Sequence, residues 1–178
     1  MRFSQTLSIF AVSVFAIAAA LLSGPAVAET RDDPWYVGPG FFLLDYTLDR
    51  SGRESSFNGT HVRFGRFFTE NLSAEARIGI GVGKNDNGFE AKDYQGVYAR
   101  WGFSPTQSIF PYGIIGFSRA RANGTGPAAP TVETGASYGL GVDFRLEDGI
   151  DINFEYLAML DTSDVELEGL LLSFTKSF

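Results

Sequence analysis

The chain of 178 residues contains no cysteine, which excludes a disulfide framework, a thiol nucleophile and a lipid-modified N-terminal cysteine. It is also poor in positive charge, with 14 basic against 21 acidic residues, and no basic cluster of the kind that nucleic-acid binding requires. After residue 28, no segment is apolar over the ~20 residues that a transmembrane helix needs. These absences argue against nucleic acid as a partner and against helical membrane anchors.

The N-terminus has the features of a secretory leader. Arg2 supplies the basic start, residues 7–22 are apolar, and Ala26-Val27-Ala28 forms a small-residue cleavage site. An apolar stretch of this length, followed directly by a cleavage site, is too short for a retained anchor. We therefore predict a signal peptide over residues 1–28, cleaved after Ala28, and a single mature domain over residues 29–178.

The mature chain alternates between apolar and polar residues with a period of two, and no helical period is sustained. Eight alternating segments of about ten to thirteen residues are separated by clusters of turn-forming residues, and each could cross a membrane as a tilted strand. Their predicted ranges are 36–48, 57–68, 72–82, 94–103, 110–121, 136–146, 149–159 and 168–178. The fold class is therefore all-β.

The segment 72–82 shows the alternation most clearly, since Leu72, Ile78 and Val82 share one face while Glu75 and Arg77 share the other. In a soluble sandwich the apolar face would turn inward, whereas in a membrane barrel it faces lipid. The connections between segments alternate between short and long along the chain, which is typical of an up-and-down membrane barrel with short periplasmic turns.

The mature chain resembles the small eight-stranded outer-membrane β-barrel family, which includes OmpX-type proteins and the OmpA membrane domain. The motifs that carry the resemblance are Trp35-Tyr36-Val37-Gly38, Thr69-Glu70-Asn71-Leu72-Ser73, Pro111-Tyr112-Gly113, Tyr138-Gly139-Leu140-Gly141-Val142-Asp143 and the terminal Phe178. It implies an eight-stranded antiparallel up-and-down transmembrane β-barrel in the bacterial outer membrane. It also implies a monomer in contact with outer-membrane lipid and lipopolysaccharide, inserted by the barrel-assembly machinery with the help of periplasmic chaperones.

In this family the C-terminal strand carries the signal for assembly, which places that role here on Phe174 and Phe178. Lys176 departs from the family pattern, where an apolar or aromatic residue is usual. Near the periplasmic rim its long side chain can reach the lipid headgroups, so the departure does not affect the predicted fold.

If the polar side of each strand faces inward, charged residues of both signs line the lumen. We predict a lumen charge network of Asp45, Arg63, Glu75, Arg77, Arg100, Arg119, Arg121, Asp143, Arg145, Asp151 and Glu155. The interior of an eight-stranded barrel is just wide enough for side chains to fill, so these charges are expected to pair as a static plug. The alternative is a gate whose ion pairs rearrange to pass ions.

Aromatic residues cluster towards the predicted strand ends, where they suggest a girdle at the membrane interfaces. The residues are Trp35, Tyr36, Tyr46, Phe67, Phe68, Trp101, Phe103, Phe110, Tyr112 and Phe178.

Motifs for catalysis or cofactor binding are incomplete. One hypothesis makes His61 a catalytic base, as in outer-membrane lipid A acylases and deacylases, which resemble this protein in size. The residues after it are Val62 and Arg63, so no His-x-Ser pair exists. The glycine-rich run 79–84 lacks the spacing and hydroxyl of a phosphate loop, and the stretch 85–90 lacks a full calcium-ligand series. We interpret the acidic run of Asp161, Asp164, Glu166 and Glu168 as a solvated face, with a divalent-ion site as the alternative. We predict no cofactor, metal or enzyme activity.

The sequence thus predicts an integral outer-membrane barrel with a plugged lumen that serves envelope structure or surface interaction. A narrow porin-like channel for small solutes is the main alternative, followed by a lipid A-modifying enzyme or an adhesin.

Overall fold

A computed structural model describes residues 33–48, 53–82, 90–104, 106, 108–123, 131–161 and 166–178. The predicted leader and its cleavage site at Ala28 lie outside these residues, as does most of the glycine-rich and acidic run between 83 and 90. Within the described part, no helix combines the length and the apolar character needed to cross a membrane.

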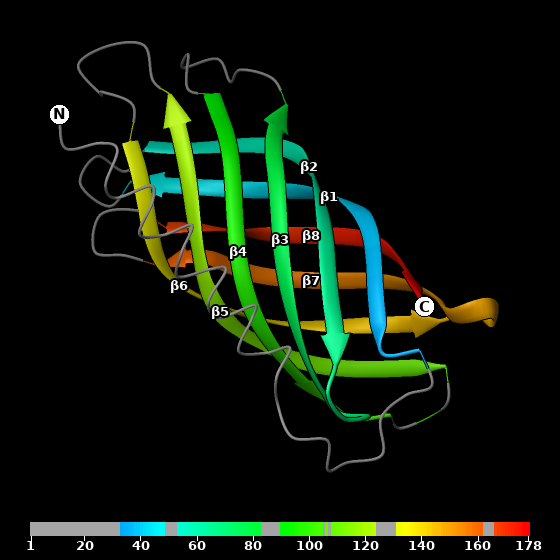
Figure 1. Cartoon of the computed structure of the whole chain (residues 1–178). Helices are drawn as coiled ribbons and strands as arrows, with labels where there is room; N and C mark the ends of the chain where they lie inside the picture. Colours follow the sequence, from blue (N-terminus) through cyan, green and yellow to red (C-terminus); the bar gives the residue numbers. More distant parts are fainter. Residues whose placement is uncertain are drawn as a thin grey trace, which may run out of the picture.

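Eight antiparallel strands form one closed ring in which each strand pairs with its neighbours in sequence and β1 pairs with β8 (Figure 1). Their bounds are β1 Trp35–Leu48, β2 Arg53–Phe67, β3 Leu72–Val82, β4 Glu90–Gly102, β5 Ile109–Asn123, β6 Thr131–Arg145, β7 Ile150–Asp161 and β8 Glu166–Ser177. The prediction of an eight-stranded up-and-down antiparallel barrel is confirmed, and most strands begin or end a few residues beyond their predicted limits.

The connections divide the barrel into two ends. At the turn end, β2 joins β3 through residues 68–71 and a single 3-10 turn, Glu147–Gly149, joins β6 to β7. This turn requires two residues with positive φ, Asp148 and Gly149. The described chain also begins and ends here, because the backbone groups of Trp35 and Phe178 hydrogen-bond to each other at 3.3 and 2.9 Å. The other end, towards residues 49–52, 83–89, 124–130 and 162–165, is called the loop end below.

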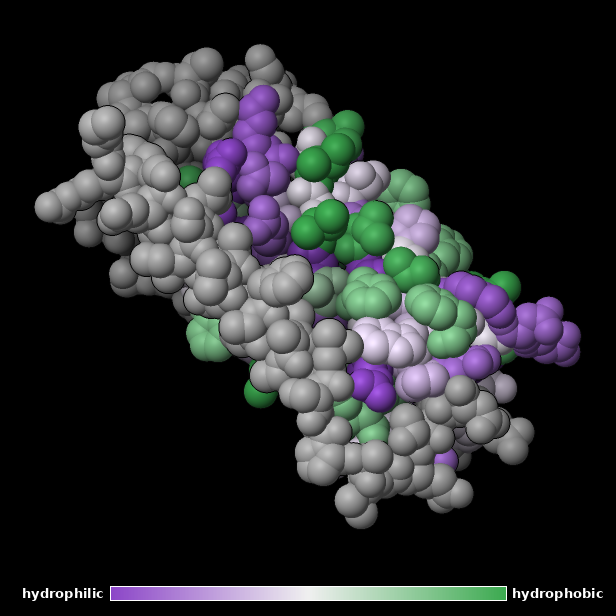
Figure 2. Space-filling model, viewed as in Figure 1, coloured by the Kyte–Doolittle hydropathy of each residue, from purple (hydrophilic) through white to green (hydrophobic). Residues whose placement is uncertain are grey.

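The outer wall of the barrel is apolar. On β3, the exposed residues Ile78, Ile80 and Val82 alternate with the inward residues Glu75 and Arg77, as the sequence predicts. A soluble sandwich would bury the apolar side, whereas here it is the exposed side that carries the large apolar residues. Figure 2 shows apolar and pale residues along the middle of the visible wall, with hydrophilic residues gathered towards its two ends.

Glycines on the inner side make room for large inward-facing rings. A Cβ atom at Gly65 would collide with the ring of Tyr36, and one at Gly141 would collide with the ring of Tyr112. In both cases the glycine and the aromatic residue face each other across neighbouring strands. The many glycines therefore allow the lumen to hold aromatic side chains that a uniform row of larger residues would exclude.

Candidate functional site: the filled interior of the barrel

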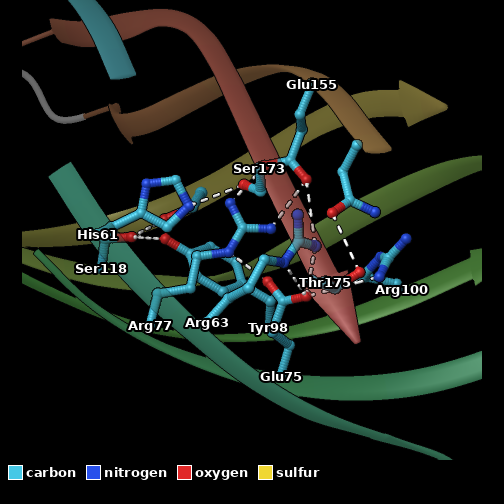
Figure 3. A network of polar contacts seen from close by, with 12 residues as sticks. His61, Arg63, Glu75, Arg77, Tyr98, Arg100, Ser118, Glu155, Ser173 and Thr175 are labelled. Carbon is cyan, nitrogen blue, oxygen red and sulfur yellow. Dashed lines mark hydrogen bonds and ion pairs between the residues drawn. The ribbon is translucent and has the colours of Figure 1, made fainter. Parts of the chain in front are cut away.

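The centre of the lumen holds three arginines and three carboxylates that the wall hides almost completely from solvent. Arg63, Arg77 and Arg100 have exposed fractions of 0%, 1% and 1%. They come from β2, β3 and β4, while the acidic partners are supplied by β3, β6 and β7 as Glu75, Asp143 and Glu155. Figure 3 shows most of these side chains converging from strands on different sides of the barrel.

Glu75 lies at the centre of this group and contacts all three arginines. Its Oε2 atom accepts hydrogen bonds from Nε of Arg63 at 2.9 Å and Nη2 of Arg63 at 2.5 Å, and its Oε1 atom accepts one from Arg77. The hydroxyl of Tyr36 donates to Glu75 Oε2 at 2.9 Å, and Nη1 of Arg100 lies 3.5 Å from the same oxygen. One carboxylate thus faces three guanidinium groups, and charge-assisted bonds of this kind are among the strongest polar contacts in proteins.

Glu155 and Asp143 complete the charge balance. Arg77 forms a bidentate pair with Glu155, in which its Nη2 atom donates to Oε2 at 2.8 Å, and the Tyr112 hydroxyl donates to Glu155 at 2.8 Å. Arg100 pairs with Asp143, and its guanidinium also lies 3.7 Å from the centre of the Tyr112 ring. The charges at this depth compensate one another, which is the condition under which buried charges are tolerated.

Apolar side chains close the lumen above this network, towards the loop end. They belong to β1, β7 and β8 and are at most 4% exposed: Phe42, Leu44, Leu157, Met159, Leu160, Leu167 and Leu171. Towards the turn end, Phe67 and Phe110 pack edge to face, with ring centres 6.1 Å apart. The polar network therefore lies between two apolar layers.

Not all of the predicted lumen residues belong to this network. Asp45 has its side chain on the outer wall, where it accepts a hydrogen bond from Ser56 at 2.7 Å. Arg119 and Arg121 share a face of β5 with the exposed residues Ile115 and Phe117, because side chains alternate strictly along that strand. The predicted lumen positions of these three residues are therefore wrong.

Arg145 and Asp151 lie on the inner side but near the turn end, apart from the central group. Arg145 donates to Ser104 at 3.0 Å and stacks over the ring of Phe110 at 4.7 Å, and Asp151 is 7% exposed. They form a second polar layer at the rim.

The predicted aromatic girdle is also partly wrong. Trp101, Phe103 and Phe178 are exposed on the outside, as a girdle requires. Four members instead fill the lumen and are at most 4% exposed: Tyr36, Phe67, Phe110 and Tyr112. The side chain of Tyr46 lies outside the described part of the structure.

The interior also contains a histidine–serine contact that sequence reasoning missed. Nε2 of His61 on β2 lies 3.0 Å from Oγ of Ser173 on β8, although the two residues are far apart in the chain. They meet above Gly40 of β1, which pairs with both and has no side chain to separate them. Only the closure of β1 onto β8 creates this contact, so no local motif could have revealed it.

This contact lacks the third group of a catalytic triad. Nδ1 of His61 is buried and has no hydrogen-bond partner within the described residues, so no carboxylate orients the ring. Both His61 and Ser173 are at most 3% exposed.

A closed barrel with an apolar outer wall and a charged, filled interior defines a class of protein, the small β-barrels of bacterial outer membranes. The model of the family described as "Outer membrane protein beta-barrel domain" matches residues 14–178, and the chain belongs to this family. It is therefore a protein of the bacterial outer membrane.

Solved structures with low sequence identity share the fold. Ail, the attachment invasion locus protein of Yersinia pestis, is 16% identical with a TM-score of 0.62, over 84% of this chain and 99% of Ail. Neisserial surface protein A is 17% identical with a TM-score of 0.62, over 81% and 97%. The N-terminal barrel of Pseudomonas aeruginosa OprF is 14% identical with a TM-score of 0.54, over 79% and 96%. Among curated proteins, none matches the sequence.

Proposed function

We propose that this protein is a non-conducting, non-catalytic outer-membrane barrel that serves envelope structure or surface interaction. The observation that carries the proposal is the network of Arg63, Arg77, Arg100, Glu75, Asp143 and Glu155, which is enclosed between two apolar layers. An ion crossing this lumen would have to separate buried, hydrogen-bonded charges and then pass an apolar constriction. Both steps oppose conduction.

Surface interaction would then depend on the loop end. Ail, which has the same fold, has been solved in complex with the heparin analogue sucrose octasulfate. A barrel of this fold can therefore bind a ligand, and function in a shared fold resides in sites that vary from member to member.

The decisive experiment is single-channel recording of the refolded protein in a planar lipid bilayer. The wild type should give no stepwise current. The double variant Arg77→Ala/Glu155→Ala removes both members of a bidentate ion pair, so neither charge is left behind without its partner. This variant should leave more open space within the central network and raise the frequency of current steps.

A matched control removes an ion pair on the outer wall. Arg121 and Asp93 lie 3.3 Å apart there, with side chains that are 40% and 32% exposed. The double variant Arg121→Ala/Asp93→Ala should leave the recordings silent. Steady stepwise conductance in the wild type would refute the proposal and support the narrow porin-like channel.

A further inference from the structure

The polar layer at the turn end contains two opposite charges that do not pair with each other. Arg145 on β6 and Asp151 on β7 are direct neighbours in the register of the two strands, and Asp151 is paired in the same way with Thr175 on β8. Side chains of such neighbours point to the same face of the sheet, and their Cβ atoms are roughly 5 Å apart. Within the described residues, however, no ion pair joins Arg145 to a carboxylate, and Asp151 accepts no hydrogen bond.

The guanidinium group of Arg145 has donors on one edge that make no hydrogen bond. Nη1 donates to Ser104 at 3.0 Å, and the group lies 4.7 Å from the centre of the Phe110 ring. Nε and Nη2 are buried and have no partner in the described part of the chain. Because these two atoms lie on the same edge of the planar group, they can hold both oxygens of a carboxylate in parallel hydrogen bonds.

Asp151 suits a ligand group of the opposite kind. Its exposed fraction is 7%, and a carboxylate at that level of burial is ordinarily hydrogen-bonded or paired with a cation. The next acid along the lumen, Asp143, already accepts hydrogen bonds from Arg100 and from Asn153 and cannot donate one. The carboxylate of Asp151 therefore favours a positively charged group that donates hydrogen bonds.

An open groove of about 680 Å³ reaches this layer from the turn end. Its lining residues are Ser108, Arg145, Leu146 and Glu147, so it lies between the connection from β4 to β5 and the turn from β6 to β7. The latter turn projects beside the C-terminus (Figure 1). Short turns of outer-membrane barrels face the periplasm, so we expect the groove to open there. A small polar molecule can then reach Arg145 without crossing the central network.

The charges around the groove disfavour an ion of a single sign. A simple anion at Arg145 would lie close to the acidic groups of Asp151 and Glu147, and a simple cation at Asp151 would lie beside the unpaired Arg145. A ligand that carries both charges on neighbouring atoms avoids both repulsions. The α-amino acid group has this property, because its ammonium and carboxylate groups are bonded to the same carbon.

We propose that the turn end of the barrel binds an α-amino acid group, whose carboxylate pairs with Arg145 and whose ammonium group pairs with Asp151. Thr175 supports the ammonium contact, since its hydroxyl donates to Asn153 at 3.3 Å and its oxygen can still accept a hydrogen bond. The site lies on the turn-end side of the central network, so binding requires no passage through the barrel. The inference therefore goes beyond the proposed function and does not depend on it.

The first experiment compares ligands on the wild type. The refolded protein in detergent micelles is titrated with alanine at neutral pH, while NMR follows the side-chain Nε–H of Arg145 and the backbone amide of Asp151. Propionate supplies the carboxylate alone and ethylamine supplies the ammonium group alone. Alanine should give saturable shifts, and the other two should bind more weakly by about tenfold or more, because each leaves one charged side chain unpaired.

A further probe distinguishes two sources of the group. Nε-acetyllysine presents the α-amino acid group at the end of a longer chain. Binding of alanine and Nε-acetyllysine alike would mean that the site accepts an end group of a larger molecule. Binding of alanine alone would restrict the site to a small free amino acid.

The second experiment removes one contact at a time. Arg145→Gln and Asp151→Asn should each weaken alanine binding by about tenfold or more. The matched controls are Arg66→Gln, which removes a cation of the outer wall at the same end, and Asp148→Asn, which changes an acid of the turn at a positive φ that asparagine adopts readily. Both controls should bind alanine like the wild type. The gel mobility of the folded form establishes that each variant has folded.

Three results would overturn the proposal. Equal affinity of the wild type for alanine and propionate would mean a contact with anions only, and this comparison needs no variant to fold. Alanine binding that survives Arg145→Gln or Asp151→Asn would place the ligand elsewhere. The third result is a wild type without saturable shifts on alanine addition. If Asp151→Asn then moved the Nε–H signal of Arg145 without ligand, the two side chains would be paired with each other in solution.

Discussion

Replacing Glu75 by glutamine tests the central network most directly. The substitution keeps the shape of the side chain but removes the negative charge that faces Arg63, Arg77 and Arg100. Those arginines would keep only Glu155 and Asp143 as anions, which leaves one positive charge in excess in a region hidden from water. Removing one partner from a buried ion pair typically costs about 3 to 5 kcal/mol. We expect a loss of this size in the free energy of unfolding.

The control for this experiment is Asp45→Asn, which makes the same chemical change on the outer wall. Asp45 is exposed and its hydrogen bond is to Ser56, so its loss should cost about 0 to 1 kcal/mol. Both variants and the wild type are unfolded with urea in lipid vesicles, and midpoints are converted to free energies by linear extrapolation. Equal losses of unfolding free energy for Glu75→Gln and Asp45→Asn would mean that water fills the lumen and screens its charges. That result would refute the plugged interior.

A double variant extends the test. Arg63→Met/Glu75→Gln removes a positive and a negative charge together, so the network stays balanced. Replacing both members of a buried pair by uncharged groups is often close to neutral. We therefore expect the double variant to be more stable than Glu75→Gln alone. A double variant less stable than Glu75→Gln alone would show that the shape of the side chains, and not charge balance, determines the stability of the central network.

Three further outcomes are expected. Gly141→Val should displace the ring of Tyr112 and lower the urea midpoint, because a Cβ atom already collides with that ring. Phe178→Ala should reduce the amount of protein assembled in the outer membrane, measured by the gel mobility of the folded form, whereas Phe154→Ala, on an outward position of β7, should not. N-terminal sequencing of the exported protein should begin at Glu29, and an intact leader would contradict the predicted cleavage.

Much of the fold could be predicted from the sequence because the period of two is visible wherever one side of a strand is polar. β3 is the clearest case, since Glu75 and Arg77 alternate with Ile78 and Ile80. The prediction failed on β5, where Arg119 shares a face with Phe117. The charge of Arg119 suggested an inward side chain. Because side chains alternate along a strand, Arg119 faces outward with Phe117, at the end of the apolar wall.

The contents of the lumen were harder to foresee. Phe42, Leu44 and Leu157 lie inside although they are as apolar as the outer wall, so composition does not distinguish the two sides. The register shift between Ala158 and Leu160 adds a further difficulty, because it changes which side chains of β7 turn inward beyond that point. Contacts such as His61 with Ser173 depend on which strands close the ring, and the sequence contains no local sign of them.

The contact between Trp35 and Phe178 has a consequence for how the barrel forms. Trp35 begins β1 and Phe178 follows β8, and the backbone groups of these two residues pair directly. The ring therefore cannot close until its final strand has left the ribosome and crossed the inner membrane, and until then both β1 and β8 have unpaired edges. Pairings so distant in sequence form slowly, and open strand edges attract other chains. We therefore expect the chain to be prone to aggregation until β8 has paired with β1.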